Sequence, residues 1–328
     1  MSEQPPIVTC LWFDHQAEEA ARFYTSIFEE SVIGPVQRYT DAGTDIHGQP
    51  EGAIMTVSFE LNGHRFVALN GGPAFTFNEA ISQQILCQTQ AEVDHYWEHL
   101  TRGGDPQAQQ CGWLKDPFGV SWQVTPVALI EAMSDPDSSR VKRVTEAMLA
   151  KKKLNLRPLR AAYEGVGEDV VFEMRRTLHA PLQRVWAAWT SPDALSRWWG
   201  PKGNPALHVE LDASPSGSFF YGLKTEGNPI WGRWDFDAFV IERRISAVQT
   251  FCDEHGQRPL RHPFEPDWPL KTHICVEFAP NGDDTDITIR WTPRDATERE
   301  VQGFVALHPA SLQGWTGTLD QLESYLRT

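Results

Sequence analysis

The sequence predicts an α+β protein with two domains. The length of 328 residues fits two ordinary domains, and two patterns along the chain support the fold class. Residues 1–126 follow the order strand, helix, three strands and then strand, helix, two strands. Residues 168–328 read as antiparallel strands that end in one long helix. The predicted boundaries place a first domain at 1–130, a helical tail and linker at 131–167, and a second domain at 168–328.

Each element of the first domain rests on a period of apolar residues. Helical spacing predicts helices at residues 17–28 and 91–101. Asn62-Gly63 lies between two alternating runs and is a strong signal for a two-residue hairpin turn. Alternation predicts strands at residues 7–12, 32–39, 54–61, 64–70, 80–88, 109–114 and 121–125. Two such modules side by side are expected to curve their sheets around a shared cleft.

The second domain is predicted as a meandering sheet with a helix laid across it. The linker before it holds two expected helices at 141–152 and 156–163, with Asp137 or Ser138 as the cap of the first. A further helix follows Pro181. Strands are predicted at residues 170–178, 206–212, 217–224, 230–241, 247–253, 271–279 and 286–292. The closing helix has one apolar stripe, made of Leu312, Trp315, Leu319, Leu322 and Leu326.

The charge of the chain argues against two classes of partner. The formal charge is −15, and residues 1–165 hold 13 Lys and Arg against 21 Asp and Glu, with 16 against 23 in the rest. Nucleic acids and anionic membranes require clustered positive charge, so neither is an expected partner. No run of residues resembles a signal peptide or a membrane span. The five scattered cysteines lack CxxC spacing, which predicts a reducing cytoplasm and no zinc site.

Three stretches of the first domain resemble a known family. They are WFDHQAEEA at residues 12–20, FVALNGGP at 66–73 and QCGWLKDPFGVSWQ at 110–123. The first domain resembles the PhnB-like branch of the vicinal oxygen chelate superfamily, and the resemblance implies that superfamily's fold of paired βαβββ modules. It also implies a homodimer, because such domains commonly pair across a two-fold axis.

The same resemblance implies four positions at which metal-dependent members hold their ion. The last position matches Gln123, the third lies at or near Ser82, the second near Ala68 or Asn70, and the first among residues 7–10. Only Gln123 has a coordinating group of the expected kind, whereas catalytic zinc or iron needs about three strong ligands. We therefore expect no metal and no cofactor. The expected small-molecule contacts of this domain are Trp12, Asn70, Trp113, Trp122 and Gln123.

PhnB-like sequences have also been labelled ubiquinone-precursor methyltransferases. Binding of S-adenosylmethionine or a dinucleotide needs a glycine-rich turn between a parallel strand and a helix. The glycine pairs at residues 71–72 and 103–104 lie in predicted loops without that context. The sequence therefore gives no support for a methyltransferase.

The second domain also carries a family pattern. It reads RTLHAPLQRVWAAWTSP at residues 176–192 and LSRWWGPKG at 195–203, and it is completed by Gly314-Trp315, Leu319 and Leu322. This domain resembles the START-like helix-grip superfamily (SRPBCC), in the branch named for the activator of heat-shock-protein-90 ATPase. The resemblance implies a cavity between the sheet and the last helix. It does not imply one activity, because this superfamily mixes ligand carriers, cyclases, hydrolases and co-chaperone-like modules.

Aromatic residues are the main candidates for a binding site in the second domain. Nine of the thirteen tryptophans follow residue 165, and large aromatics either fill a core or line an apolar site. The loop 258–269 has four prolines together with Phe264 and Trp268, which suggests a cover over a cavity. His273 lies in a region rich in His and carboxylates and is a candidate general base. The expected ligand contacts are Trp198, Phe220, Trp234, Phe236, His273, Trp291 and Trp315.

Three classes of function stay open at this stage. The favoured one is a protein that binds or sequesters a small apolar or aromatic metabolite without a catalytic metal. The first alternative is an enzyme of lyase, isomerase or hydrolase type acting on such a metabolite, with no catalytic residue yet assigned. The second alternative is a co-chaperone-like interaction module.

Overall fold

The computed structural model describes residues 7–257, 259–262 and 265–328. The chain forms two compact units. Unit 1 contains residues up to Ile85 together with Asp94–Thr125 and Lys151–Lys153, and unit 2 contains Leu86–Val93, Pro126–Ala150 and Leu154–Thr328. Each unit mixes helices with sheets, so the predicted α+β class is confirmed.

Unit 1 has two sheets. One sheet has the order β1-β4-β3-β2, with β1 parallel to β4, and the other has the order β5-β7-β6. The strands are β1 (Thr9–Phe13), β2 (Ser31–Arg38), β3 (Ile54–Leu61), β4 (His64–Asn70), β5 (Gln83–Cys87), β6 (Trp113–Lys115) and β7 (Ser121–Pro126). The helices are α1 (Ala17–Ile27), α2 (Thr44–His47), α3 (Gln90–Thr101) and the 3-10 turn η1 (Pro106–Ala108). The end of β5 and the start of α3, within Leu86–Val93, belong to unit 2. The predicted hairpin turn is confirmed: Asn62 and Gly63 both have positive φ, at 47° and 78°.

A buried carboxylate joins α1 to the turn before β7. Asp116 is 2% exposed, and its Oδ2 accepts hydrogen bonds from the Tyr24 hydroxyl at 2.7 Å and the Trp122 indole at 2.8 Å. Its Oδ1 accepts from the backbone N–H groups of Phe118 and Val120. Burial raises the pKa of Tyr24 well above its usual range, and the neighbouring carboxylate adds to this, so the hydroxyl keeps its proton and donates.

Unit 2 is built on one antiparallel sheet with helices on both sides. The sheet order is β8-β15-β14-β12-β11-β10-β9, and β13 pairs with β12. Its strands are β8 (Phe172–Leu178), β9 (Ala206–Leu211), β10 (Ser218–Leu223), β11 (Ile230–Val240), β12 (Arg244–Cys252), β13 (Pro259–Leu260), β14 (Lys271–Asn281) and β15 (Asp284–Arg294). Its helices are α4 (Val127–Met133), α5 (Ser138–Leu149), α6 (Leu156–Glu164), η2 (Glu168–Val170), α7 (Leu182–Thr190), α8 (Pro192–Trp198), α9 (Glu298–Ala306) and α10 (His308–Leu326).

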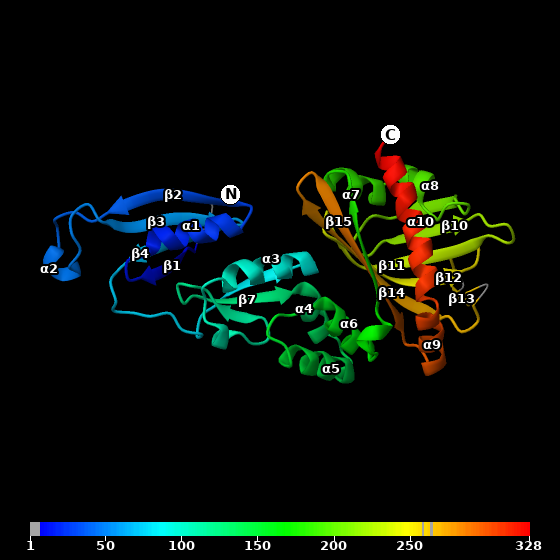
Figure 1. Cartoon of the computed structure of the whole chain (residues 1–328), viewed down its shortest axis with the longest axis horizontal. Helices are drawn as coiled ribbons and strands as arrows, with labels where there is room; N and C mark the ends of the chain where they lie inside the picture. The colour runs from blue at the N-terminus through cyan, green and yellow to red at the C-terminus, as the bar shows by residue number, and fades with distance from the viewer. Residues whose placement is uncertain (1–6, 258, 263–264) are drawn as a thin grey trace, which may run out of the picture. The chain divides into compact units, whose positions relative to one another are not determined.

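Side-chain alternation gives the sheet two different faces. On β14, Ile274 and Val276 point into the main apolar core, and His273, Cys275 and Glu277 point to the other face. α10 lies along the core face, as Figure 1 shows. The linker helices α4, α5 and α6 contribute the wall that covers the other face. The sequence predicts α5 and α6 but not α4, whose apolar residues run on from β7 without a break.

Removal of the Asp116 carboxylate should destabilise the protein strongly. Asp116→Ala leaves two buried side-chain donors and two backbone N–H groups without an acceptor, and we expect the free energy of unfolding to fall by about 3 kcal/mol or more. Urea unfolding followed by circular dichroism measures this change. Asp105→Ala is the matched control, because Asp105 caps only the exposed turn η1 and should cost about 1 kcal/mol or less. Equal effects of the two substitutions would contradict this account of Asp116.

Candidate functional site

The core face of the unit 2 sheet contains a cavity of about 400 Å³. We call it the aromatic cavity, because seven aromatic rings line it: Trp199, Tyr221, Trp234, Phe251, Trp268, Trp291 and Trp315. The rings contact one another edge to face or tilted, for example Trp268 and Trp291 with centroids 5.1 Å apart. Such packing fixes the rings around the space they enclose.

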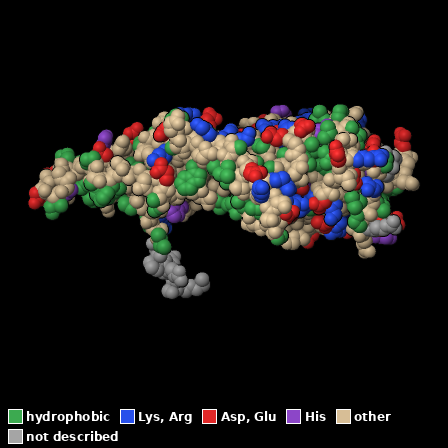
Figure 2. All heavy atoms as spheres, turned by 90° about the horizontal axis from the view of Figure 1, so that it is seen from below, with side chains coloured by type: hydrophobic (Ala, Val, Ile, Leu, Met, Phe, Trp, Pro, Cys, Tyr) green, Lys and Arg blue, Asp and Glu red, His purple; other side chains and the backbone are tan. Residues whose placement is uncertain are grey.

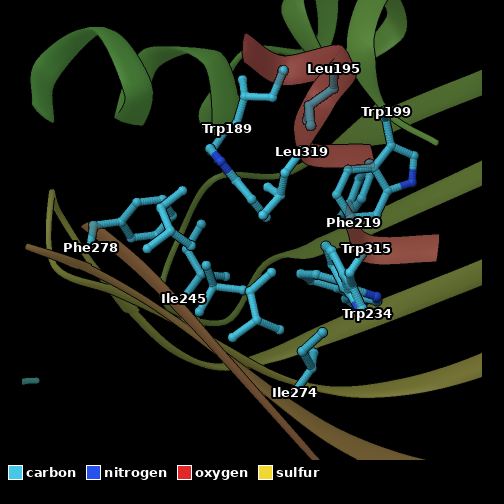
Figure 3. Close-up of a cluster of buried hydrophobic side chains, with 14 of the residues drawn as sticks. Trp189, Leu195, Trp199, Phe219, Trp234, Ile245, Ile274, Phe278, Trp315 and Leu319 are labelled. Atoms are coloured by element: carbon cyan, nitrogen blue, oxygen red, sulfur yellow. The ribbon is translucent and has the colours of Figure 1, made fainter. Parts of the chain in front are cut away.

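The cavity exists because one part of α10 carries small side chains. Leu319, Leu322 and Leu326 fill the space between the C-terminal part of the helix and the sheet. The preceding part presents Ala310, Ser311, Gly314 and Thr318 to the cavity. A Cβ atom placed on Gly314 would have no atom within 4 Å, so this stretch of helix does not reach the opposite wall. Figure 3 shows Trp315 of α10 close to Trp234 and Trp199, above Ile274 of the sheet.

A few polar groups interrupt the apolar wall. The indole Nε1 of Trp291 is buried and has no hydrogen-bond partner among the described residues. The Tyr221 hydroxyl is protonated at all ordinary pH values, because burial raises its pKa well above the usual range. Burial lowers the pKa of His262, and the nearby Glu265 opposes that effect, so this imidazole lines the cavity in its neutral form. These groups are suited to orient a mostly apolar ligand.

The structure separates the residues predicted for this domain into three groups. Trp234, Trp291 and Trp315 line the aromatic cavity. Trp198 and Phe236 pack in the apolar core beside it, with Trp198 only 1% exposed. Phe220 lies on the opposite face of the sheet from Tyr221 and stacks on Trp231 with centroids 5.5 Å apart. Of the two aromatics in the proposed covering loop, Trp268 lines the cavity, and Phe264 lies outside the described residues.

His273 belongs to a second cavity, of about 370 Å³, on the other face of the same sheet. We call it the charged cavity. The linker helices supply Glu131 and Arg160, together with apolar residues such as Leu129 and Leu159. The sheet supplies Asp237, Arg244, Ser246, His273, Glu277, Arg290 and Arg294.

One nitrogen of His273 is the centre of a buried polar cluster. Its Nε2 lies 2.8 Å from Oδ2 of Asp237, 3.0 Å from Oγ of Ser246 and 3.3 Å from Nη1 of Arg160. Burial lowers the pKa of His273 to about 4, and Arg160 adds to this, so the ring is neutral near pH 7. Burial raises the pKa of Asp237, but hydrogen bonds from His273 and Ser246 outweigh it, and the pKa falls well below its usual range.

This cluster differs from a catalytic triad. In a triad the acid and the nucleophile contact opposite nitrogens of the imidazole, so that one orients the ring while the other loses a proton to it. Here Asp237 and Ser246 meet the same nitrogen. With Asp237 ionised and His273 neutral, Nε2 carries the proton that is donated to Asp237. It cannot also serve as a base toward Ser246.

In unit 1, three of the predicted contacts already serve the local structure. The side-chain oxygen of Asn70 accepts from the backbone N–H of Ala17 at the start of α1, and its amide donates to the carbonyl of Ile54. The indole of Trp12 donates to the carbonyl of Gly72 at 2.8 Å. Trp122 is buried and donates to Asp116.

The two remaining predicted contacts share one face of the β5-β7-β6 sheet. Trp113 and Gln123 are register partners on neighbouring strands, and both are half-buried. The amide of Gln123 donates to the hydroxyl of Ser82 at 2.8 Å. Gln123 and Ser82, which the family resemblance places at or near two of its metal positions, are therefore neighbours, and both side chains are neutral. Among the described residues, no group of three or more His, Cys, Asp or Glu side chains is arranged to bind a metal ion.

Most of the charged cavity was not foreseen from the sequence. Arg244, Glu277 and Arg290 occupy strand positions that alternate with core residues, which is the pattern of an ordinary solvent-facing side. The signal that could have revealed them is the apolar face of α6, which includes Leu156 and Leu159. A short amphipathic helix next to a sheet has to cover some part of it.

The surface shows no concentration of one charge on the visible face. In Figure 2 the Lys and Arg side chains are interspersed with Asp and Glu. In the part of the chain that the structure describes, no helix combines the length and the apolar character needed to cross a membrane.

Two family models match the chain and confirm both resemblances seen in the sequence. Residues 5–125 match the model described as 3-demethylubiquinone-9 3-methyltransferase. Residues 179–327 match the model described as activator of Hsp90 ATPase homolog 1-like protein. No curated protein matches the chain.

Three solved structures that are similar to the chain each match about half of it or less. A putative 3-demethylubiquinone-9 3-methyltransferase, PhnB protein, from Bacillus cereus is 36% identical, and the match covers 37% of this chain and 99% of that protein with a TM-score of 0.32. A protein from Arthrobacter aurescens is 26% identical over 49% of this chain and 87% of its own, with a TM-score of 0.41. The AHSA1 protein from Silicibacter pomeroyi is 16% identical, and the match covers 48% of this chain and 97% of that protein, with a TM-score of 0.37.

The depressed pKa of His273 predicts a loss of stability in acid. Between pH 6.5 and about 4 the unfolded chain binds a proton at this residue and the folded chain does not, so stability falls as the pH falls through that window. The variant His273→Gln can still donate from its amide to Asp237, but it has no imidazole to protonate. The fall in stability that is due to His273 is therefore absent from the variant. We expect the wild type to lose about 3 kcal/mol more than the variant between pH 7 and pH 4.

Urea unfolding at a series of pH values measures the difference. His255→Gln is the matched control and should keep the wild-type profile, because the side chain of His255 is 73% exposed. If His273→Gln and the wild type show parallel profiles, the buried neutral state assigned to His273 is wrong.

Proposed function

We propose that the chain binds a small apolar or aromatic metabolite in the aromatic cavity. The chain belongs to the PhnB-like family through residues 5–125, and the cavity lies in its AHSA1-like domain, which covers residues 179–327. The observation that supports this most strongly is the hollow beside Gly314, which seven aromatic rings line. A space of about 400 Å³ lies within the usual range of small-molecule sites.

The lining also indicates the kind of ligand. Aromatic faces favour a flat or apolar molecule, which releases water from the wall when it enters. The unpartnered indole N–H of Trp291 suits a ligand with one hydrogen-bond acceptor, such as a carbonyl or ether oxygen. Among the described residues, Trp234 and Gln249, which also line the cavity, have an unpartnered indole nitrogen and an unpartnered amide oxygen. The ligand is therefore a mostly apolar ring system with few polar groups.

We do not extend the methyltransferase name of the PhnB relatives to this chain. The turn between β1 and α1 reads Asp14-His15-Gln16 and holds no glycine. The first free backbone N–H of α1, at Ala17, is already bonded to the side chain of Asn70. This strand–helix junction therefore lacks the glycine-rich, anion-binding turn that a nucleotide cofactor site of that type uses.

Two accompanying expectations remain predictions. None of the five cysteines forms a disulfide, which is consistent with a reducing compartment such as the cytoplasm. Pairing of two copies through the PhnB-like domain rests on the family resemblance.

Filling the hollow at Gly314 should abolish binding without harming the fold. Gly314→Leu places a side chain of α10 in the open space of the cavity. It also replaces glycine, which has the lowest helix propensity after proline, so the melting temperature should stay the same or rise. The neutral fluorescent probe N-phenyl-1-naphthylamine should bind the wild type and lose at least about tenfold in affinity with the variant.

Gln313→Leu is the matched control, because it adds the same side chain to the same helix at an exposed position. It should bind the probe as the wild type does. The proposal fails if the wild type does not bind the probe, or if Gly314→Leu binds it equally well. Turnover of a metabolite found by the same assay would replace the simple binding role by an enzymatic one.

A further inference from the structure

The charged cavity has the character of a second binding site, with a chemistry different from that of the aromatic cavity. Three of its ion pairs are closed within the protein. Arg290 pairs with Glu173 at 2.7 Å and with Glu277 at 2.6 Å, and Arg244 pairs with Glu131 at 2.8 Å. These pairs hold the sheet side of the cavity in place. The other charged groups of the wall are Arg160, Arg294 and Asp237.

Among the remaining charges, one guanidinium has no ion-pair partner in the described part of the chain. The wall holds four arginines and three carboxylates, and Glu173 beside it also pairs with Arg290, so the two charges balance in number. Arg294 lies 3.9 Å from Asp237, whose Oδ2 is already bonded to His273. Arg160 has no carboxylate within ion-pair distance among the described residues, and the nitrogen that its guanidinium approaches is the protonated Nε2 of His273. The guanidinium of Arg160 therefore faces the cavity without an acceptor.

A second donor on the same wall also lacks a partner. The side chain of Arg244 is 2% exposed, and its Nε is buried with no hydrogen-bond partner among the described residues. An unsatisfied buried donor of a charged group costs free energy until an acceptor reaches it. A carboxylate is such an acceptor, and two parallel N–H bonds are the arrangement that guanidinium groups prefer.

The rest of the wall is apolar and comes from the linker helices. Leu129, Val144 and Leu159 belong to a small apolar cluster of these helices and also line the cavity. Leu156 of α6 and Val248 of β12 add to the same lining. A ligand that fits this wall has one negative charge at one end and an apolar body at the other.

We propose that the charged cavity binds a small monocarboxylate with an apolar body, its carboxylate on Arg160 and its body against the linker helices. Such a ligand would connect α6 to the sheet of unit 2. It would therefore favour the arrangement in which the linker helices cover the sheet. This site is separate from the aromatic cavity, because the two lie on opposite faces of the sheet.

Calorimetric titration of the full chain with benzoate and with hexanoate at pH 7.5 tests the proposal. We expect binding of at least one of the two, and none of the uncharged amides benzamide and hexanamide. Arg160→Gln should weaken binding at least about tenfold, because it removes the charge of the guanidinium. Arg197→Gln, which changes an exposed arginine of α8, should leave binding unchanged.

The two cavities provide controls for each other. Arg160→Gln should still bind N-phenyl-1-naphthylamine, which shows that the variant is folded, and Gly314→Leu should still bind the carboxylate. Failure of both acids to bind the wild type would overturn the proposal. So would equal affinity of Arg160→Gln, or loss of acid binding in Gly314→Leu, which would move the acid to the aromatic cavity.

Discussion

The architecture of unit 2 depends on one constraint, which is that a single antiparallel sheet is covered by helices on both faces. Successive side chains of a strand point to opposite faces, so β12 and β14 have to satisfy two different environments at once. Ile274 packs against the core beneath α10, and its neighbour His273 lies among charged groups beneath the linker helices. A slip of one residue in either strand would exchange these sets and bury unpaired charges in the core.

Both cavities follow from the way in which the helices meet that sheet. α10 is held close by Leu319 and Leu322 and is separated from the sheet where Gly314 faces it, so one helix both closes the core and leaves a hollow. On the other face, Arg244 of the sheet pairs with Glu131 of a linker helix, and Arg290 pairs with Glu277 within the sheet. The first hollow is apolar, and in the second the guanidinium of Arg160 has no carboxylate within ion-pair distance among the described residues.

The sequence predicts local features better than it predicts the space between elements. The Asn62-Gly63 turn and the apolar stripe of α10 are local patterns, and both are present in the structure, except that Leu312 of the predicted stripe is 48% exposed. The sequence cannot tell whether a tryptophan fills a core or lines a cavity, because that depends on the residue across the gap. Trp198 and Trp234 look alike in the sequence, and only Trp234 faces the small residues of α10. The charged cavity depends in the same way on contacts between Arg160 and His273, which are 113 positions apart.

The aromatic cavity is proposed to be an open site for a mostly apolar ring compound. The most direct measurement is a crystal structure of the full chain soaked with 4-bromophenol, in which anomalous scattering locates the bromine. We expect a bromine signal between Gly314, Trp234 and Trp291, with the phenol oxygen accepting from the Trp291 indole. A cavity closed by the tryptophan side chains, or a bromine signal confined to other parts of the molecule, would contradict it.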